Sequence, residues 1–505
     1  MIFTQEKKYL VMLSIIFALS LFLRMHNLAN LLIFTADEEY QLTLAKTIVE
    51  HFHIIWIGVG AADSGFYLGP FWTYLTAFLL FLSKGDPLIT GYVAAILGVI
   101  TTGLITLVGF KLFNIRVGLI SGFLYSCLPL IVFYDQRYWN VTLVPLLSLV
   151  MVLLLFLTKD SAKWWLLFAG AYGLIFHVHL SLVPVGFLAV YFFIKQKVYL
   201  NKQVSALSLL IFLIVVSPLI AFDYFHKGSN ITTPIRIIKM SSDNPARINI
   251  VSHSSTLFES LGRLWYLRPF SSNADEILAD CAQTPLFGNA DINLSTSRTK
   301  PVFWLSLLGI SLVIWFLVKK STWKKFSTKL LALTIITITL GFLLYPGIVI
   351  EYYLLGLFPL ILILPALLVD SLKGNLKYLA YYFVVLVCIL GIFTVTHASD
   401  EFGLAIKKTL IQKVGGVVDA SFDLKEYGKC QQYAGWRYLF TVYGKKPDKS
   451  SVDSTLGWLY PKDIKLGKLK YSVIMSESRV QQLFNIKEAR VISEGGFKGF
   501  IFTNY

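Results

Sequence analysis

About eleven long apolar stretches run through the sequence, and they constrain its fold most, because a helix of about 20 apolar residues crosses a bilayer. Hydrophobic residues make up 56% of the 505 residues, more than soluble proteins usually carry. We therefore predict a polytopic α-helical membrane protein. The expected spans are Tyr9–Leu23, Leu88–Phe110, Val117–Tyr134, Val141–Leu157, Trp164–Phe176, Leu182–Ile194, Val204–Phe222, Val302–Val318, Leu330–Tyr345, Tyr352–Val369 and Lys377–Val395.

The lysine and arginine residues of the short connections set the expected orientation. If Phe66–Leu82 does not cross the bilayer, nearly all of these residues fall on the same side as Lys7 and Lys8. Cytoplasmic loops carry such a basic excess, so we expect Phe66–Leu82 to be a juxtamembrane helix on the outer side of the cell membrane. The net charge of +16 has the same origin and does not indicate nucleic acid as a partner. The first span lacks a small-residue cleavage site and is expected to be retained.

This orientation gathers acidic, histidine and aromatic residues on the outer face, in loops 24–87 and 225–300 and at the ends of several spans. Ionisable groups at membrane depth are costly, and they usually mark a functional site. We therefore expect the active site on this face, outside the cytoplasm. The gathered residues are Asp37, Glu38, Glu39, Asp63, Asp135, Gln136, Arg137, Trp139, His177, His179, Asp223, His226, Glu351, Tyr352 and Tyr353.

The composition changes near residue 396, where apolar runs shorten and charges intersperse. We expect a transmembrane module at 1–395 and a small soluble α/β domain outside the membrane at 396–505. Cys281 and Cys430 would both lie outside, where a disulfide could form, and the four cysteines have no metal-site spacing. The domain is predicted to contain a helix at Trp436–Val442 and strands at Tyr471–Met475, Ala489–Ser493 and Gly499–Phe502.

Three consecutive acids, Asp37, Glu38 and Glu39, follow the first span and begin a helical pattern. Thr35 and Glu38 fit a capping box, in which the two residues satisfy each other's backbone N–H groups. The helix dipole also favours acids in a first turn. These structural roles explain Glu38 well and Glu39 in part. They explain Asp37 less well, so Asp37 is the candidate catalytic residue.

A series of short motifs follows one another along roughly the first 370 residues: Thr35–Glu39, Phe66–Pro70, Gly85–Pro87, Tyr134–Asn140, His177–Ser181, Ser217–Asp223 and Glu351–Leu354. Their order resembles the GT-C superfamily of polyprenyl-phosphate-sugar-dependent glycosyltransferases, which includes protein O-mannosyltransferases and lipid A aminoarabinose transferases. Two positions depart from those subfamilies. Tyr67–Pro70 stands where a His-Pro-Pro motif is common, and Glu351 stands where a histidine often precedes the tyrosine.

The resemblance implies an inverting transfer of a sugar from a polyprenyl phosphate to an acceptor, with Asp37 as the general base. A carboxylate can take the proton that the acceptor hydroxyl loses as it attacks. The leaving lipid phosphate needs a cation, for which Arg137 is the candidate and Arg263 and Arg268 are rivals. The structural alternative for Arg137 is an ion pair with Asp135 or a role as an interface anchor beside Tyr138 and Trp139. The other predicted substrate-binding residues are Glu38, Asp63, Tyr67, Asp135, His177, Asp223, Glu351 and Tyr352.

No cofactor is expected. Asp37 and Glu38 could hold a divalent metal, but two adjacent carboxylates are weak evidence for one, because hard cations want several oxygen ligands. The expected partners are the lipid-phosphate sugar, an acceptor of unknown kind and membrane lipids. Two alternatives remain open. A transporter or lipid flippase would place charges at mid-span and break its helices there, whereas these acids lie at span ends. The second alternative is also an enzyme, a ligase that moves whole lipid-linked glycans.

Overall fold

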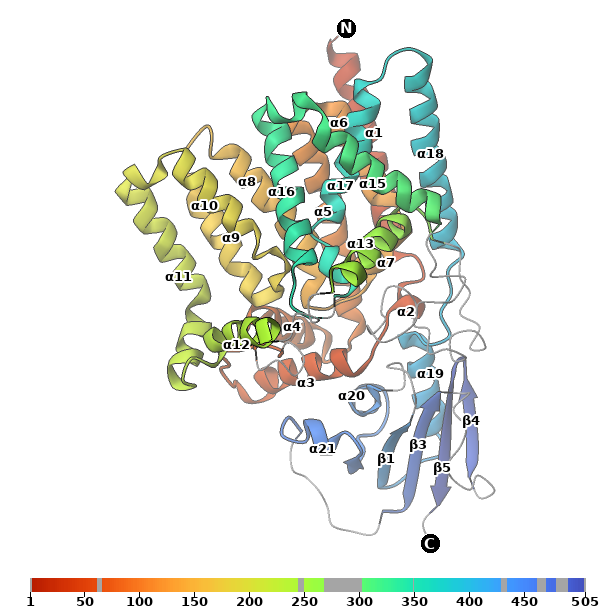
Figure 1. Cartoon of the computed structure of the whole chain (residues 1–505). Helices are drawn as coiled ribbons and strands as arrows, with labels where there is room; N and C mark the ends of the chain where they lie inside the picture. Colours follow the sequence, from red (N-terminus) through yellow and green to blue (C-terminus); the bar gives the residue numbers. More distant parts are fainter. Residues whose placement is uncertain are drawn as a thin grey trace.

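The computed structural model describes residues 2–60, 66–243, 249–267, 302–347, 349–427, 434–460, 469–477 and 489–503. Its first part is a bundle of apolar helices that stand side by side (Figure 1). The bundle contains α1 (Ile2–Met25), α5 (Leu88–Leu112), α6 (Ile115–Cys127), α7 (Pro129–Gln136), α8 (Val144–Leu157), α9 (Trp164–Val178), α10 (Val185–Lys195), α11 (Lys202–Phe225), α15 (Phe303–Val318), α16 (Phe326–Leu343), α17 (Phe358–Ser371) and α18 (Asn375–Thr396).

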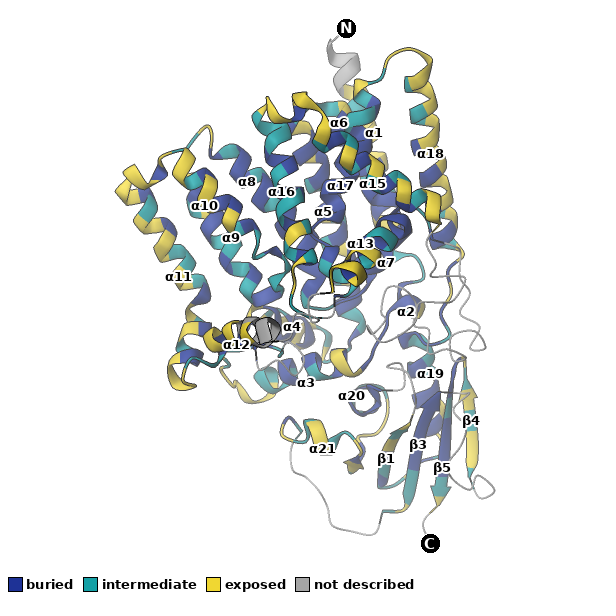
Figure 2. Cartoon of the chain, viewed as in Figure 1, coloured by how far each residue is buried: buried dark blue, intermediate teal, exposed yellow. Residues whose placement is uncertain are grey.

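In the described part of the chain, 6 helices are long and apolar enough to cross a membrane, and one bent pair and five shorter apolar helices accompany them. Each predicted span coincides with one of these helices or, for Val117–Tyr134, with the bent pair, which confirms the polytopic helical fold. Buried residues fill the middle of the bundle, while the outer helices α11 and α18 expose large apolar side chains (Figure 2). Those exposed apolar faces suit contact with lipid.

The predicted span Val117–Tyr134 is not one straight helix. It consists of α6 and α7, which meet at an angle of 65°. Leu128 between them has an extended backbone, and Pro129 begins α7 without an N–H group to continue the α6 hydrogen-bond pattern. The bend carries the Asp135–Arg137 segment to the end of the bundle.

Shorter helices lie across that end (Figure 1). They include α2 (Leu28–Leu31), α3 (Ala36–His51), α4 (Phe71–Ser83), α12 (Ser229–Asp243) and α13 (Ile250–Trp265). The predicted juxtamembrane helix Phe66–Leu82 corresponds to α4, which packs against α3 through Ala77 and Leu80. The chain's N-terminus lies at the opposite end of the bundle (Figure 1).

The C-terminal part is a small α/β domain beneath α3 (Figure 1). It contains α19 (Leu404–Gly415), β1 (Phe422–Tyr427), α20 (Trp436–Tyr443), β2 (Lys449–Ser450), α21 (Asp453–Leu456), β3 (Tyr471–Glu477), β4 (Arg490–Glu494) and β5 (Phe497–Thr503). The sheet order is β2-β1-β3-β5-β4, with β1 parallel to both neighbours and the β3, β5 and β4 pairings antiparallel. The predicted helix and strands correspond to α20, β3, β4 and β5, whereas α19, β1 and β2 were not predicted.

The C-terminal domain shares a hydrophobic core with the membrane module. Leu32, Phe34 and Leu42 from the module pack in one cluster with Trp436 and Leu439 of α20. Burial of apolar surface is the main favourable term in such an association. The residues on either side of Thr35 are therefore packed against the domain, which matters for the site described next.

Candidate active site

The N-terminus of α3 is held by the predicted capping box. Oε2 of Glu38 accepts hydrogen bonds from the Thr35 backbone N–H (2.9 Å) and from the Thr35 hydroxyl (2.6 Å). The Thr35 hydroxyl oxygen in turn lies 3.4 Å from the Asp37 backbone nitrogen, which donates to it. This arrangement confirms the capping box and engages one of the two oxygens of Glu38.

Arg137 engages the other oxygen. Its Nε donates to Oε1 of Glu38 at 2.9 Å, and its guanidinium lies 4.2 Å from the centroid of the Trp139 ring. Both charged side chains are buried, with 4% and 6% of their surfaces exposed. Asp135 pairs with Arg24 and not with Arg137, so the ion-pair alternative is wrong. The contact with Trp139 agrees with the interface-anchor alternative. Glu38 instead connects the α3 N-terminus to the segment that follows α7.

Asp37 differs from its neighbour. Its side chain is 70% exposed, and Oδ2 lies 3.9 Å from Nη2 of Arg137. Within the described part of the chain, no donor hydrogen-bonds to its carboxylate. Desolvation by the surrounding protein raises the pKa of Asp37, Glu38 raises it further, and Arg137 opposes both. Solvent reaches most of the side chain, so that desolvation is partial. The carboxylate is thus ionisable and accessible beside a fixed cation.

Glu39 lies in a third environment. It is 1% exposed, and its Oε1 accepts hydrogen bonds from the Tyr438 backbone N–H and the Tyr460 hydroxyl, both at 2.9 Å. Burial raises the pKa of Glu39, while these two hydrogen bonds and Lys407 act to lower it. Asp37 therefore faces the solvent, Glu38 faces the membrane module, and Glu39 faces the C-terminal domain, although the three acids are consecutive in the sequence.

A second carboxylate lies on the same side of the bundle. Glu351 begins the 3₁₀ helix η7 (Glu351–Leu354), and its side chain is 4% exposed. It accepts from Arg263 Nε at 2.6 Å and from the Tyr134 hydroxyl at 3.2 Å. The neighbouring ring of Tyr352 packs edge-on against Trp139, with centroids 4.7 Å apart. Trp139 therefore has Arg137 and Tyr352 as neighbours, which brings the predicted residues Arg137, Glu351 and Tyr352 together.

Two predicted substrate-binding residues have protein partners away from Asp37. Asp135 pairs with Arg24 of α1, with Nε 2.8 Å from Oδ2. His177 contacts two backbone groups: Nε2 lies 2.7 Å from the Val215 carbonyl, and Nδ1 accepts from the Phe71 N–H at 3.4 Å. These contacts make a neutral His177 with its proton on Nε2 the fitting form. Both residues brace helices in this structure.

Tyr67 and Asp223 meet through Asn230 at the start of α12. The Tyr67 backbone exchanges hydrogen bonds of 2.8 and 3.0 Å with the Asn230 amide, and Asp223 accepts from the Asn230 N–H at 2.7 Å. This cluster fixes the loop before α4 to the α11–α12 turn. Asp63, the rival cation Arg268 and the Cys281–Cys430 pair lie outside the described residues.

Sequence reasoning missed three residues of this region. Arg24 ends an otherwise apolar first span, and a lone arginine there could have been noticed. Tyr438 and Tyr460 carry no such signal, because they reach Glu39 from 399 and 421 residues further along the chain. Among the described residues, no group of three His, Cys, Asp or Glu side chains could hold a metal ion, and the absence of a metal stays a prediction.

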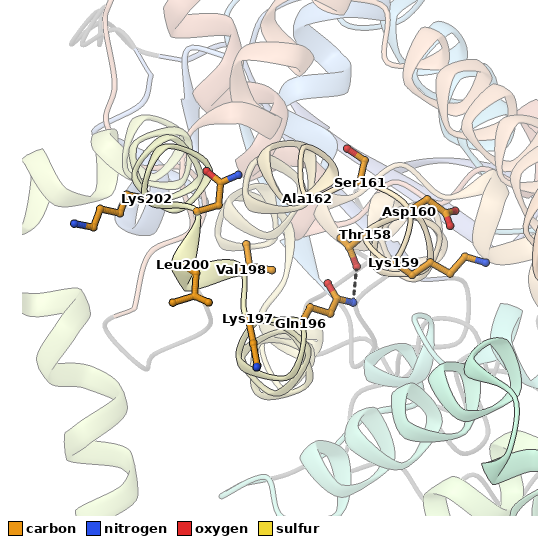
Figure 3. A pocket seen from close by; sticks show the side chains of 11 residues that line it. Thr158, Lys159, Asp160, Ser161, Ala162, Gln196, Lys197, Val198, Leu200 and Lys202 are labelled. Carbon is orange, nitrogen blue, oxygen red and sulfur yellow. Dashed lines mark hydrogen bonds between the residues drawn. The ribbon is translucent and has the colours of Figure 1, made fainter.

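A separate cavity of about 1000 Å³ lies between the α8–α9 and α10–α11 connections (Figure 3). Lys159, Lys197 and Lys202 line it but point away from one another, and Thr158 and Gln196 hydrogen-bond at its centre. These side chains do not converge on a common point, and none belongs to the cluster around Asp37. The cavity is therefore not part of the candidate site.

Comparisons with known proteins agree with the overall fold. The family model of dolichyl-phosphate-mannose-protein mannosyltransferases matches residues 68–222. The structure of ArnT from Cupriavidus metallidurans bound to undecaprenyl phosphate is 10% identical, covers 98% of each chain and has a TM-score of 0.54. The predicted resemblance to the GT-C superfamily agrees with these matches: residues 68–222 fit this family model, and the whole chain has a fold similar to that of ArnT.

A second solved structure has a similar fold. The apo oligosaccharyltransferase of Archaeoglobus fulgidus is 13% identical, with 92% of this chain and 69% of that chain covered and a TM-score of 0.52. No curated protein sequence matches the chain. The predicted glycosyltransferase class is confirmed by the family match and the GT-C fold together. The roles of individual residues are the subject of the proposal below.

Proposed function

We propose that this GT-C glycosyltransferase moves a sugar from a polyprenyl-phosphate donor to an acceptor hydroxyl, with inversion, and that Asp37 is its general base. The observation that carries the proposal is that the three acids at the start of α3 lie in three different environments. Glu38 and Glu39 have their carboxylates engaged by protein groups, whereas Asp37 is 70% exposed. A general base needs a free oxygen within reach of the proton that it takes.

The charge around Asp37 suits this role. Its raised pKa makes the carboxylate a stronger base than an ordinary aspartate, and Arg137 beside it favours the ionised form at neutral pH. Arg137 is also our candidate cation for the leaving lipid phosphate, because its guanidinium lies next to the base and is held in place by Glu38 and Trp139. The lipid seen in the structurally similar ArnT supports a donor of the same class.

We further propose that the site faces the outside of the membrane. The basic short connections lie at the end of the bundle that contains the N-terminus, and the basic side of a membrane protein is cytoplasmic. Single cysteines at Lys84 and Lys373, introduced into a background without native cysteines, test this orientation. A membrane-impermeant maleimide should label Lys84→Cys in intact cells and Lys373→Cys only after lysis. Labelling of Lys373→Cys alone in intact cells would contradict it.

The activity itself is tested with purified protein and a panel of polyprenyl-phosphate sugars offered with candidate acceptors. Release of polyprenyl phosphate together with a product of inverted anomeric configuration is expected. Lipid-diphosphate-linked oligosaccharides serve as a second donor panel, and turnover of these alone would favour the ligase alternative. Protein in liposomes that moves intact donor between leaflets without releasing sugar would favour the flippase.

A further inference from the structure

The chain segment that leads into α3 passes directly against the C-terminal domain. The Leu404 N–H donates to the Leu32 carbonyl at 2.8 Å, which joins the start of α19 to this segment. Two residues further along this segment, the Phe34 carbonyl accepts from Lys407 Nζ at 2.7 Å, and the same Nζ donates to the Ala434 carbonyl at 2.6 Å. The residue immediately before the Thr35 cap is therefore held by a side chain of the domain.

Lys407 is an unusual residue for this position. It is completely buried, and its ammonium lies near the rings of Trp436 (4.8 Å) and Phe497 (5.1 Å). A buried lysine is costly unless it is hydrogen-bonded and its charge is balanced. Burial lowers the pKa of Lys407 to about 8, while Glu426 and Glu39 favour its charged form. Its only carbonyl partners among the described residues are Phe34 and Ala434.

A second connection lies on the other side of the cap. Glu39 accepts from Tyr438 N–H and from the Tyr460 hydroxyl, and the ring of Tyr438 stacks on Phe34 with centroids 5.7 Å apart. Gly435, at φ +92°, allows the domain backbone to close on this segment, because a Cβ there would lie 2.8 Å from the Phe34 ring. The domain thus contacts residues 34 and 39, which lie on either side of Asp37.

We propose that the C-terminal domain is a positioning element of the active site, and that Lys407 and the Tyr438–Tyr460 pair fix the backbone that carries Asp37. This inference rests on the proposed role of Asp37. The Asp37 carboxylate is exposed, and its contact with Arg137 is long, at 3.9 Å. Its location is therefore set by its backbone. A misplacement of about 1 Å at a reacting group lowers the rate on the order of a hundredfold.

The test uses the full-length protein in nanodiscs and two independent readouts. Hydrogen–deuterium exchange of residues 35–41 reports whether the C-terminal domain holds this segment in place. The dependence of the transfer rate on donor concentration reports the effect on catalysis. Lys407→Met removes the donor to Phe34, and Glu39→Leu removes the acceptor for Tyr438. Both should speed exchange in this segment and lower kcat by roughly ten- to a hundredfold, with the donor KM changed by less than about threefold.

Two matched variants separate positioning from general damage. Glu39→Gln keeps an oxygen for the Tyr438 N–H, so it should restore slow exchange and keep kcat within about threefold of wild type. Glu494→Gln breaks the exposed Lys413–Glu494 ion pair of the same domain and should leave both readouts unchanged. Exchange within α5 reports global folding. If Lys407→Met does not fold, Tyr460→Phe takes its place, because it removes one hydroxyl and leaves the buried lysine intact.

Unchanged exchange at residues 35–41 in both Lys407→Met and Glu39→Leu would show that these contacts do not hold the segment in place. Faster exchange with unchanged kcat would overturn the positioning role. If the wild-type protein transfers no sugar from any donor, the proposed function fails, whereas the exchange experiment still decides whether the domain holds this segment. A large rise in donor KM at constant kcat would also contradict positioning, because it would indicate a donor-binding role for the domain.

Discussion

The buried pair of Arg24 and Asp135 offers a quantitative test of which acids are structural. Arg24 is completely buried, and its Nε and Nη2 lie 2.8 and 2.7 Å from Oδ2 of Asp135. Its remaining N–H groups donate to the Ser20 hydroxyl (2.9 Å) and to the carbonyls of Ser126 (3.2 Å) and Tyr125 (3.1 Å). The guanidinium is thus fully satisfied by the protein, and it joins α1 to both halves of the broken α6–α7 span.

Asp135→Asn keeps the shape of the side chain and removes its charge, which leaves Arg24 buried without a counter-charge. Breaking a buried ion pair in this way destabilises by about 3–5 kcal/mol. The double variant Arg24→Met, Asp135→Leu removes both charges and should cost less than Asp135→Asn alone, because no unpaired charge remains. The unfolding free energy of each variant is measured in detergent micelles by SDS titration, with thermal melts as a second probe.

The reasoning is refuted if Asp135→Asn unfolds within about 0.5 kcal/mol of wild type, the range of ordinary surface substitutions, and loses donor binding instead. That result would return Asp135 to the substrate-binding group. The pair also bears on the transporter alternative, which predicts buried charges and broken helices near mid-span. Here the buried charge stabilises the break, since the Arg24 guanidinium bonds both helices. It donates to the Tyr125 and Ser126 carbonyls of α6 and to the Asp135 carboxylate of α7.

Two further predictions follow from the site. The rate of transfer should rise with pH as Asp37 ionises, because a general base acts only when deprotonated. Glu38→Gln removes a charge that raises the pKa of Asp37, so the acid limb of the kcat/KM profile should move to lower pH. A limb that moves to higher pH would contradict this. Gly69→Ala would place a Cβ into the His177 ring and should destabilise the folded protein by about 1–3 kcal/mol, measured in a thermal melt. The control Gly415→Ala places its Cβ in open space and should leave the stability unchanged. Equal melting temperatures of the two variants would contradict the close approach of Gly69 to His177.

The sequence predicted the membrane spans well, because long apolar stretches report burial in lipid directly. It also predicted the capping box, which depends on residues three apart. It did not predict the α6–α7 break, since Leu128 and Pro129 continue the apolar run. Nor could it predict that Arg137 turns to Glu38 instead of Asp135. Partners that differ by about a hundred positions in the chain are set by packing and leave no local pattern.

The C-terminal domain shows the same limit. The strands β3, β4 and β5 were predicted from the sequence, whereas the contact between the domain and the active-site helix was not. Glu39 binds a backbone N–H of Tyr438, and any residue other than proline supplies such a group. Lys407 likewise binds a backbone carbonyl of Phe34. Side-chain chemistry alone therefore could not reveal that the domain holds both sides of Asp37.

The most direct test of the account is the effect of Asp37→Asn on donor binding and sugar transfer. Asparagine keeps the size of the side chain, and the Thr35–Glu38 box maintains the helix start, so stability should change by about 1 kcal/mol or less. Glu50→Gln, on the exposed end of the same helix, is the matched control. Donor affinity should stay near that of wild type while transfer falls at least about a hundredfold. Transfer by Asp37→Asn at the rate of Glu50→Gln would show that Asp37 is not the base.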